Sequence, residues 1–312
     1  MPLLSFLNKF LPFGGFCVTI IKIFYFRYGE KMYKKKKTIL IAIILVFLLT
    51  AALDNHLKIV YYKLETDKIS NPLRLALITD LHSCRYGENE QKLAAAINAQ
   101  KPDILMFVGD IFDDQISDAN TEALLSAVAA DYPCYYVTGN HEYWRGTQAF
   151  NTKMQILADY NVKRLATDTD TITINEETIN ICGVDDPDAY RVNNTDIQSG
   201  IASFQKQIVQ LNKLNTNGNY TILLTHRPEY FQFYTKQSFD LVLCGHAHGG
   251  QWRLPSLING IYAPNQGFLP KYAGGQYQEN DTTMIVSRGL ARESTRIPRI
   301  FNRPELVIID LT

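Results

Sequence analysis

The sequence predicts a mixed α/β sandwich with buried sheets. From Leu73 onward, continuous apolar runs of strand length alternate with longer stretches of helical periodicity. The order is strand, helix, strand, helix, strand, followed by a hairpin, a long helix and further strands. With 312 residues and 46% hydrophobic content, the chain is long enough to form one large domain around a substantial core.

The predicted strands are short apolar runs that end at a glycine or at a polar residue. They cover residues 73–79, 104–108, 134–138, 220–224, 241–244, 284–287 and 306–309, and residues 171–174 and 178–181 read as a hairpin. The predicted helices cover residues 88–100, 121–130, 147–160 and 196–214, and Asn120 is a suitable cap for the second of them.

Charge is distributed unevenly along the chain. Residues 1–37 hold eight Lys or Arg residues and one Glu, a net charge of +7, which leaves −7 for the rest of a chain with zero formal charge. An acidic body lacks the basic face of a general nucleic-acid binder, so no nucleic-acid partner is expected. The five cysteines are widely spaced without a C-x-x-C pair, which indicates neither a disulfide framework nor a zinc knuckle.

The basic run Lys34–Lys37 is followed by sixteen uncharged residues, 38–53. As a helix they would be ~24 Å long, and snorkelling lysines can extend that towards the ~30 Å hydrocarbon core. We therefore expect a single-pass anchor in the cell membrane, with the lysines in the cytoplasm and the rest of the chain outside it. A signal peptide cleaved near residues 50–52 is the alternative.

The expected domain organisation has four parts. Residues 1–33 form an extension of uncertain role, since Met32 is an alternative start of the chain, and residues 34–54 form the basic flank and transmembrane anchor. Residues 55–71 are expected to be a linker, and residues 72–312 the functional domain.

Five of the six histidines lie in short polar runs, each directly after a predicted strand. The runs are Asp80-Leu81-His82, Gly109-Asp110, Gly139-Asn140-His141-Glu142, Thr225-His226-Arg227 and Gly245-His246-Ala247-His248. Ligands of α/β sheets bind at the carboxyl ends of the strands, so these runs are expected to converge on one site. Carboxylates, an amide and imidazoles together can hold two divalent ions side by side. One D-x-H run would be weak evidence, but five such runs in order are strong evidence.

This order of motifs resembles the calcineurin-like metallophosphoesterase superfamily, from Leu73 to Thr312. Residues 245–251 and 287–290 are similar to its bacterial membrane-anchored branch, the YkuE-like and YaeI-like proteins. The resemblance implies a four-layer αββα sandwich and two divalent metal ions, for which the mixed ligands favour Mn, Fe or Zn. Thr138 stands where the protein-phosphatase branch has an arginine, which disfavours phosphoserine and phosphothreonine substrates.

The resemblance also implies roles for individual residues. Asp80, His82 and His248 would hold the first metal ion, Asn140, His226 and His246 the second, and Asp110 would bridge the two. His141 would act as general acid or stabilise the transition state. Arg288 is a candidate phosphate clamp, with a surface ion pair as the alternative. Glu142 or Asp113 are candidates to orient neighbouring imidazoles.

The expected function is hydrolysis of a phosphomonoester or phosphodiester by a hydroxide bound between the metal ions. The special case that we expect is a lipid-linked substrate, since the aromatic segment 252–277 directly follows the last ligands and could receive a lipid tail. The first alternative is hydrolysis of UDP-2,3-diacylglucosamine in lipid A synthesis, which needs a cytoplasmic site and conflicts with the expected topology. The second is a non-catalytic metal-binding scaffold, which the intact ligand set disfavours.

Overall fold

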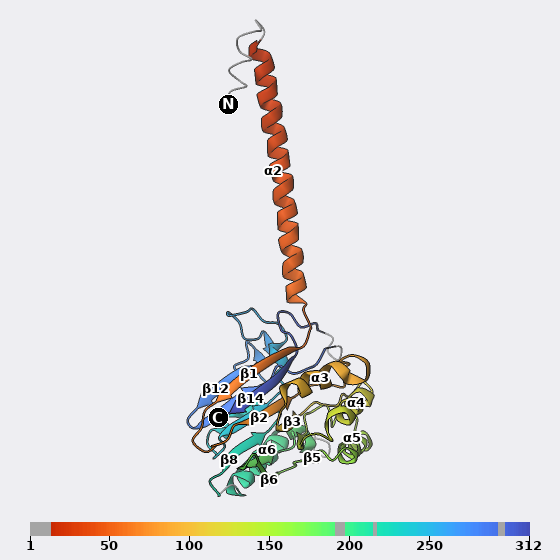
Figure 1. Cartoon of the computed structure of the whole chain (residues 1–312), viewed down its shortest axis with the longest axis vertical. Coiled ribbons are helices and arrows are strands. Elements are labelled where there is room, and N and C mark those ends of the chain that lie inside the picture. Colours follow the sequence, from red (N-terminus) through yellow and green to blue (C-terminus); the bar gives the residue numbers. More distant parts are fainter. Residues whose placement is uncertain (1–13, 191–196, 215–216, 293–296) are drawn as a thin grey trace. The chain divides into compact units, whose positions relative to one another are not determined.

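The computed structural model describes residues 14–190, 197–214, 217–292 and 297–312. The chain divides into two compact units at Ala52. In the first unit the described residues form one helix, α2 (Gly14–Ala52). The second unit contains every strand of the described chain (Figure 1).

The expected membrane anchor falls within α2. Among the residues that the structure describes, no helix combines the length and the apolar composition needed to cross a membrane. The uncharged part of α2 ends with the helix at Ala52 and covers only residues 38–52, about 22 Å against a hydrocarbon core of ~30 Å. The prediction of a single-pass membrane protein with an extracytoplasmic domain is therefore wrong. The first thirteen residues of the predicted extension lie outside the described residues.

The second unit is built on two six-stranded sheets. The first has the order β1-β14-β2-β3-β4-β5, and the second has the order β12-β13-β9-β8-β7-β6. The strands of the first sheet are β1 (Lys58–Leu64), β14 (Glu305–Leu311), β2 (Leu73–Ile78), β3 (Ile104–Val108), β4 (Cys134–Val137) and β5 (Lys163–Arg164). Those of the second are β12 (Gly275–Glu279), β13 (Thr282–Val286), β9 (Leu241–Cys244), β8 (Tyr220–Leu224), β7 (Glu177–Gly183) and β6 (Asp168–Ile174). A small antiparallel pair, β10 (Tyr262–Ala263) and β11 (Gly267–Phe268), lies outside both sheets.

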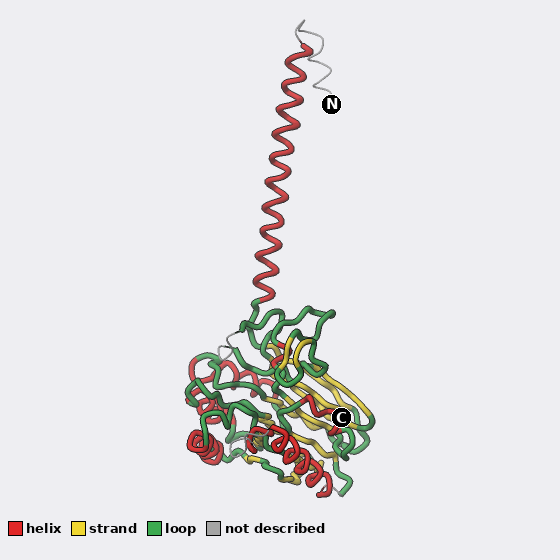
Figure 2. The backbone as a smooth tube through the Cα atoms, turned by 180° about the vertical axis from the view of Figure 1, so that it is seen from behind, coloured by secondary structure: helices red, strands yellow, loops and turns green. Residues whose placement is uncertain are grey.

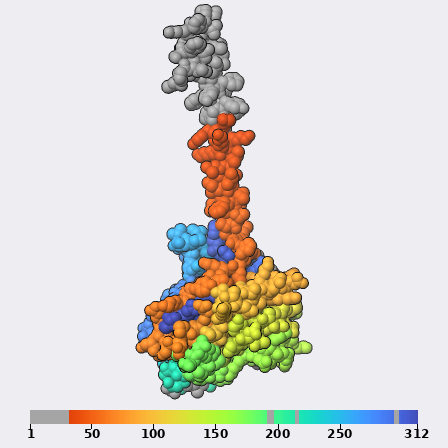
Figure 3. Space-filling view, in the orientation of Figure 1, coloured from red at the N-terminus to blue at the C-terminus, as the bar shows by residue number. Residues whose placement is uncertain are grey.

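Both sheets are parallel at their centres. β2, β3, β4 and β5 run parallel in the first sheet, and β13, β9, β8 and β7 in the second. β14 is antiparallel to β2 and parallel to β1, so the carboxyl end of the chain lies between two amino-terminal strands (Figures 1 and 3). Parallel strands bring their carboxyl ends to the same edge of each sheet.

The two sheets pack on each other, and helices cover their outer faces (Figure 2). Leu75 and Leu77 of β2 are buried with residues of β7, β8 and β9 between the sheets. Ala76 and Ile78 of the same strand point to the other face, where they are buried with α3 (Gln91–Gln100), α4 (Ala119–Val128) and α5 (Thr147–Asp159). On the second sheet, α6 (Ile197–Leu214) and α7 (Phe231–Tyr234) cover the outer face. Because both faces of the strands are buried, the strands read as continuous apolar runs.

These layers confirm the predicted mixed α/β fold with parallel sheets and helices. Residues 55–71 are expected from the sequence to be a linker, but in the structure residues 58–64 of this segment form strand β1. β1 is an edge strand with alternating exposure and two lysines, so it lacks the apolar run of a central strand. Four single-turn 3₁₀ segments complete the unit: Glu88–Glu90, Pro187–Tyr190, Pro228–Tyr230 and His248–Gly250.

Candidate metal centre

The candidate ligands come directly after the parallel strands, as expected. Asp80 and His82 follow β2, Asp110 follows β3 and Asn140 follows β4 in the first sheet. In the second sheet His226 follows β8, and His246 and His248 follow β9. The carboxyl edges of the two packed sheets together therefore carry the candidate site.

The first cluster joins Asp80, His82, Asp110 and His248. One ligand atom from each lies within 4.8 Å of the ligand atoms of the other three. His82 Nε2 is 3.7 Å from Asp110 Oδ2, and His248 Nε2 is 3.5 Å from Asp80 Oδ1. The structure thus brings the three residues predicted for the first ion next to the residue predicted to bridge.

The second cluster joins Asp110, His226 and His246, again within 4.8 Å. His226 Nε2 lies 3.1 Å from Asp110 Oδ2. Asn140 adjoins this cluster, because the amide of the next residue, His141, donates to Asp110 Oδ1 at 2.9 Å. Asp110 is the residue that the two clusters share.

Buried atoms without hydrogen-bond partners test whether cations fit here. His82 Nε2 and Asn140 Oδ1 are buried and have no hydrogen-bond partner, and His226 Nε2, also buried, faces the Asp110 carboxylate at 3.1 Å. Buried polar atoms of native proteins are rarely left in that state. The other ring nitrogens are occupied: His82 Nδ1 bonds to Asp113 Oδ2 at 3.0 Å and His226 Nδ1 to the Val108 carbonyl at 3.1 Å. This arrangement presents Nε2 as a ligand, so the residues fit a pair of divalent ions.

His246 is hydrogen-bonded through Nε2, whereas His82 and His226 are hydrogen-bonded through Nδ1. His246 Nε2 lies 2.8 Å from Asn265 Oδ1 and 2.9 Å from Arg227 Nη1, and Asn265 Oδ1 also accepts a bond from Arg227 Nη1 at 2.7 Å. Arg227 is buried and donates hydrogen bonds to both carboxylate oxygens of Asp186, from Nε to Oδ2 at 2.5 Å and from Nη2 to Oδ1 at 2.8 Å. Nδ1 of His246 is therefore the nitrogen available to an ion.

The backbone at the candidate ligands adopts a conformation that side chains seldom take. Five of them have a positive φ: Asp80 (48°), His82 (49°), Asp110 (51°), His246 (67°) and His248 (46°). Left-handed backbone at a non-glycine residue stores strain and is frequent at functional sites. Gly109 and Gly139 permit the close approach, because a Cβ at the first would meet His226 and at the second would meet Asp110.

Charge coupling in the cluster shifts the pKa values of its members. Burial would lower the pKa of His226, but the adjoining Asp110 carboxylate outweighs it and raises that pKa to about 10. Burial opposes ionisation of Asp110, yet His226 and His141 hold its pKa well below the usual range. Burial and the nearby charge of Arg227 keep the pKa of His246 well below its usual value. Burial and the nearby charge of His82 do the same for the pKa of His248. Both rings are therefore neutral and able to bind a cation.

His141 lies at the opening of the site, with 21% of its side chain exposed. Its Nδ1 bonds to Asp114 Oδ1 at 2.6 Å, and its ring meets His82 edge to face at 4.3 Å. The buried Lys153 ammonium contacts the carbonyl oxygens of Asp113 at 2.8 Å and of His141 at 3.5 Å. Asp114 and Lys153 thus fix His141 with its Nε2 left for a substrate.

Comparison with known proteins decides the family. The chain matches the calcineurin-like phosphoesterase family over residues 73–250, more than half of its length. The chain belongs to the calcineurin-like phosphoesterase family. Its activity is that of a metal-dependent hydrolase acting on phosphoester bonds, and it has residues able to hold divalent ions.

Individual relatives agree with the family. An uncharacterized metallophosphoesterase of Campylobacter jejuni is 29% identical over 85% of this chain and 67% of its own length. The uncharacterized metallophosphoesterase YkuE of Bacillus subtilis is 27% identical over 76% of this chain and 78% of its own length. The family and the YkuE-like branch predicted from the motifs are thus confirmed.

Similarity to solved structures is weaker. The NAD nucleotidase of Haemophilus influenzae has a TM-score of 0.47 and 17% identity, and the match covers 71% of this chain and 46% of the nucleotidase. This likeness is too weak to support an argument about the substrate.

Glu142 has a different place from the one suggested by the sequence. It is fully buried, and its carboxylate accepts bonds from the amides of Asp110 (3.2 Å), Phe112 (3.1 Å) and Gly139 (2.7 Å). The Glu142 carboxylate therefore binds backbone amides and does not orient an imidazole. Asp113, the other candidate, does orient an imidazole, that of His82.

Arg288 is bound to a carboxylate. Its Nε donates to Glu305 Oε2 at 2.6 Å, its Nη2 contacts the same oxygen, and its amide donates to Glu305 Oε1 at 2.9 Å. Glu305 is buried. The structure thus favours the ion-pair alternative for Arg288, in a partly buried form, over a guanidinium free to clamp phosphate.

Sequence reasoning missed several residues that contact the candidate ligands or His141, among them Asp114, Lys153, Trp144, Arg227 and Asn265. Asp114 carries a recognisable signal, because it stands four residues after Asp110 in the same loop. Asn265 has none, since it lies in the short turn between β10 and β11 and meets His246 only in the folded chain.

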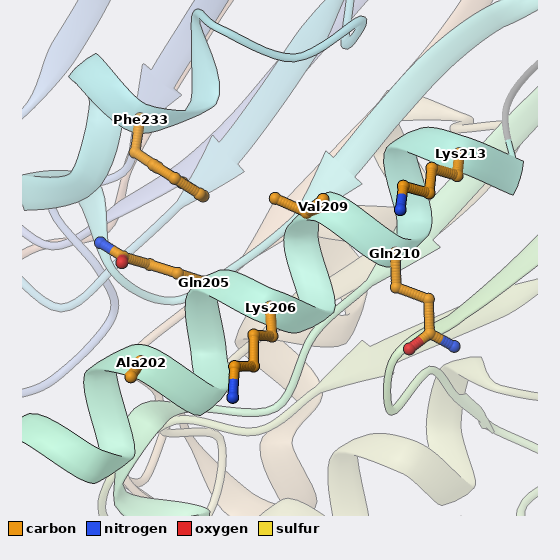
Figure 4. A pocket seen from close by; sticks show the side chains of 7 residues that line it. All are labelled: Ala202, Gln205, Lys206, Val209, Gln210, Lys213 and Phe233. Carbon is orange, nitrogen blue, oxygen red and sulfur yellow. The ribbon is translucent and has the colours of Figure 1, made fainter.

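A shallow groove of about 630 Å³ lies elsewhere, along α6 (Figure 4). Its lining includes Lys206, Val209, Lys213 and Phe233, without a carboxylate or an imidazole. None of the candidate ligands lines it. It therefore lacks the groups that metal-assisted hydrolysis requires.

Proposed function

We propose that the chain is a two-metal phosphoesterase that hydrolyses phosphomonoesters or phosphodiesters by direct attack of water, without a covalent phosphoenzyme. One observation carries the proposal: Asp110 belongs to both clusters, and its Oδ2 lies 3.7 Å from His82 Nε2 in one cluster and 3.1 Å from His226 Nε2 in the other. Such an arrangement is what a bridging carboxylate between two cations requires.

The proposed ligand sets are those expected from the motifs. Asp80, His82 and His248 would hold one ion, Asn140, His226 and His246 the other, with Asp110 between them. Imidazole, amide and carboxylate ligands suit Mn, Fe or Zn. The chemistry that bound ions of this kind would supply is a water made nucleophilic near neutral pH and a counter-charge for the phosphoryl oxygens.

His141 is proposed to protonate the leaving group. A general acid must reach the oxygen that departs, and it works best when a carboxylate fixes its tautomer. Asp114 Oδ1 accepts the Nδ1 proton of His141 at 2.6 Å. His141 would therefore act as an acid in its cationic form, which the Asp114 carboxylate stabilises, and would give up the proton on Nε2. Since His141 is partly exposed, a substrate can reach it.

A lipid-linked ester is the second candidate substrate. Leu257 and Phe268 are each 79% exposed, and Leu254 and Leu269 are exposed as well. These apolar side chains belong to the loops that carry Asn265, which bonds to His246, so an acyl chain could lie on them while its phosphate occupies the site. UDP-2,3-diacylglucosamine, in which a pyrophosphate joins uridine to a diacylated sugar, is a testable substrate with acyl chains.

The experiment uses the full chain with added Mn²⁺ and three substrates: p-nitrophenyl phosphate, bis-p-nitrophenyl phosphate and UDP-2,3-diacylglucosamine. We expect hydrolysis of at least one of them that depends on metal and stops with a chelator. Two bound ions without turnover of any ester would favour a non-catalytic scaffold and contradict the proposal.

His141→Ala tests the general acid. We expect kcat to fall by about 10²–10⁴-fold for an alkyl ester, whose leaving oxygen needs a proton, and by less for a p-nitrophenyl ester. His56→Ala is the matched control, because His56 is exposed and bonds to Asp54 away from the clusters. Equal losses for both esters would exclude proton donation by His141.

A further inference from the structure

A half-exposed tryptophan lies directly against His141. The ring centroids of Trp144 and His141 are 4.0 Å apart, with an angle of 39° between the ring planes. Trp144 remains 54% exposed. One side of the indole therefore rests on the imidazole, and a large part of the ring stays open to a ligand.

The indole is fixed from several sides. Trp144 Nε1 donates to Asp188 Oδ2 at 3.0 Å, and the Asp188 side chain is itself buried. The turn that carries Trp144 is closed by bonds from Tyr143 N to the Asn140 carbonyl at 3.1 Å and from Gly146 N to the Tyr143 carbonyl at 3.0 Å. A ring that is already ordered loses little conformational freedom when a ligand stacks on it.

The position of Trp144 is tied to the leaving group. If His141 protonates the departing oxygen, as the proposed function holds, then the group attached to that oxygen must lie beside His141. Trp144 occupies that side. The groups that hold the pair, Asp114 and Asp188, are carboxylates, which disfavour an anionic leaving group there.

We propose that Trp144 is a stacking platform for a planar, neutral aromatic ring in the leaving group, as found in aryl and nucleoside esters. Flat rings stack on tryptophan whatever their substitution, because every such ring has a π face. This inference rests on the proposed function and names the substrate class of the same site.

Two esters of similar size test the proposal: phenyl phosphate, whose ring is planar, and cyclohexyl phosphate, whose ring is puckered. In Trp144→Ala we expect the phenyl-to-cyclohexyl ratio of kcat/KM to fall about 5- to 150-fold relative to the unchanged protein. Trp144→Phe should keep most of the ratio. Tyr61→Ala is the matched control, since Tyr61 is 57% exposed on edge strand β1, and it should leave the ratio unchanged.

Adenosine gives a readout that needs no turnover. The chain has two tryptophans, Trp144 and Trp252, so Trp144→Phe leaves only the emission of the second. We expect adenosine to quench the fluorescence of the unchanged protein and not that of Trp144→Phe.

A larger loss for cyclohexyl phosphate than for phenyl phosphate would show that Trp144 only orients His141, because the alkyl ester depends more on proton donation. Equal losses for the two esters, which leave the ratio unchanged, would likewise overturn the proposal. Quenching that persists in Trp144→Phe, or that is absent from the unchanged protein, would also overturn it. If no ester is hydrolysed at all, the proposed function fails, and adenosine quenching still decides whether Trp144 binds a planar ring.

Discussion

At the scale of residues, the hydrogen bond that one ring nitrogen of each imidazole makes with the protein decides which nitrogen is left to face an ion. Asp113 holds Nδ1 of His82 and the Val108 carbonyl holds Nδ1 of His226, so both rings offer Nε2. Asn265 holds Nε2 of His246 instead. Partners of this kind fix the tautomer and orientation of a ligand.

Asn265 is therefore expected to control affinity for the second ion. Its φ of 60° suits glycine, so Asn265→Gly removes the amide without adding backbone strain. We expect the affinity for Mn²⁺ or Zn²⁺ to fall about 10–100-fold, measured by calorimetric titration, and Asn265→Asp to retain an acceptor and most of the affinity. Asn280→Gly is the control, since Asn280 also has a positive φ (52°) and lies in the β12–β13 turn. Unchanged affinity in Asn265→Gly would refute this role.

Protons should leave the site when ions bind. In the metal-free protein, Asp110 overcomes the effect of burial and raises the pKa of His226 to about 10, so His226 is protonated at pH 7. A proton that is bound more tightly in the folded state stabilises the metal-free fold fully below the unfolded pKa of about 6.5, and this contribution is lost as the pH rises through about 10. An ion that binds at Nε2 must displace this proton, so metal affinity should rise with pH. Calorimetry in two buffers of different ionisation enthalpy measures the release, and identical heats would contradict it.

The sequence could name the candidate ligands because each follows a recognisable apolar strand. It could not name Arg227 or Asn265 as neighbours of His246, because each lies 19 residues from His246 and no periodic pattern links them. It offered two alternatives for Arg288, and only the folded chain places Glu305 against it.

At the scale of elements, the loops that follow β3 and β4 are joined by one buried carboxylate. Glu142 accepts bonds from Asp110 and Phe112 in the first loop and from Gly139 in the second. Burial raises the pKa of Glu142, and these amides partly offset that effect. The two loops carry Asp110, Asn140 and His141, so Glu142 sets their separation.

Glu142→Gln tests this link. Glutamine has one acceptor oxygen and places an N–H group where the other oxygen met a backbone amide. We expect the free energy of unfolding to fall by about 1–3 kcal/mol, measured by urea denaturation of the metal-free protein. Glu122→Gln, on the exposed side of α4, is the control and should change stability by less than about 0.5 kcal/mol. A similarly small change in Glu142→Gln would contradict the role given to its hydrogen bonds.

Central elements were predictable from the sequence and edge elements were not. β2, β3, β8 and β9 are almost wholly buried, so their sequences are mainly apolar, and Arg74 of β2 is the one charged residue among them. β1 is paired only with β14, more than 200 residues away, and reads as an irregular connection. Its strand conformation depends on a partner that local pattern cannot show.

At the scale of the whole molecule, the interface between the two sheets holds the site together, because each sheet supplies part of both clusters. Leu77 lies in this interface, fully buried, three residues before Asp80. The anchor prediction failed because it relied on apolar composition, whereas the uncharged part of the helix, which ends at Ala52, is too short to cross a membrane.

Leu77→Ala should destabilise the second unit. Removal of a fully buried leucine side chain leaves a cavity between the sheets, and we expect the free energy of unfolding to fall by about 2–5 kcal/mol in chemical denaturation. Leu257→Ala, at a residue that is 79% exposed, should change it by less than about 0.5 kcal/mol. A loss below about 1 kcal/mol for Leu77→Ala would mean that the sheets do not pack as described.

The most direct test of the central claim measures metal content and turnover together, in the full chain and in Asp110→Asn. If Asp110 bridges two ions, the unchanged protein should bind about two ions per chain and hydrolyse a phosphoester, while Asp110→Asn should lose at least one ion and most of the turnover. A protein that binds no ion, or an Asp110→Asn variant that keeps both ions and full turnover, would contradict the account.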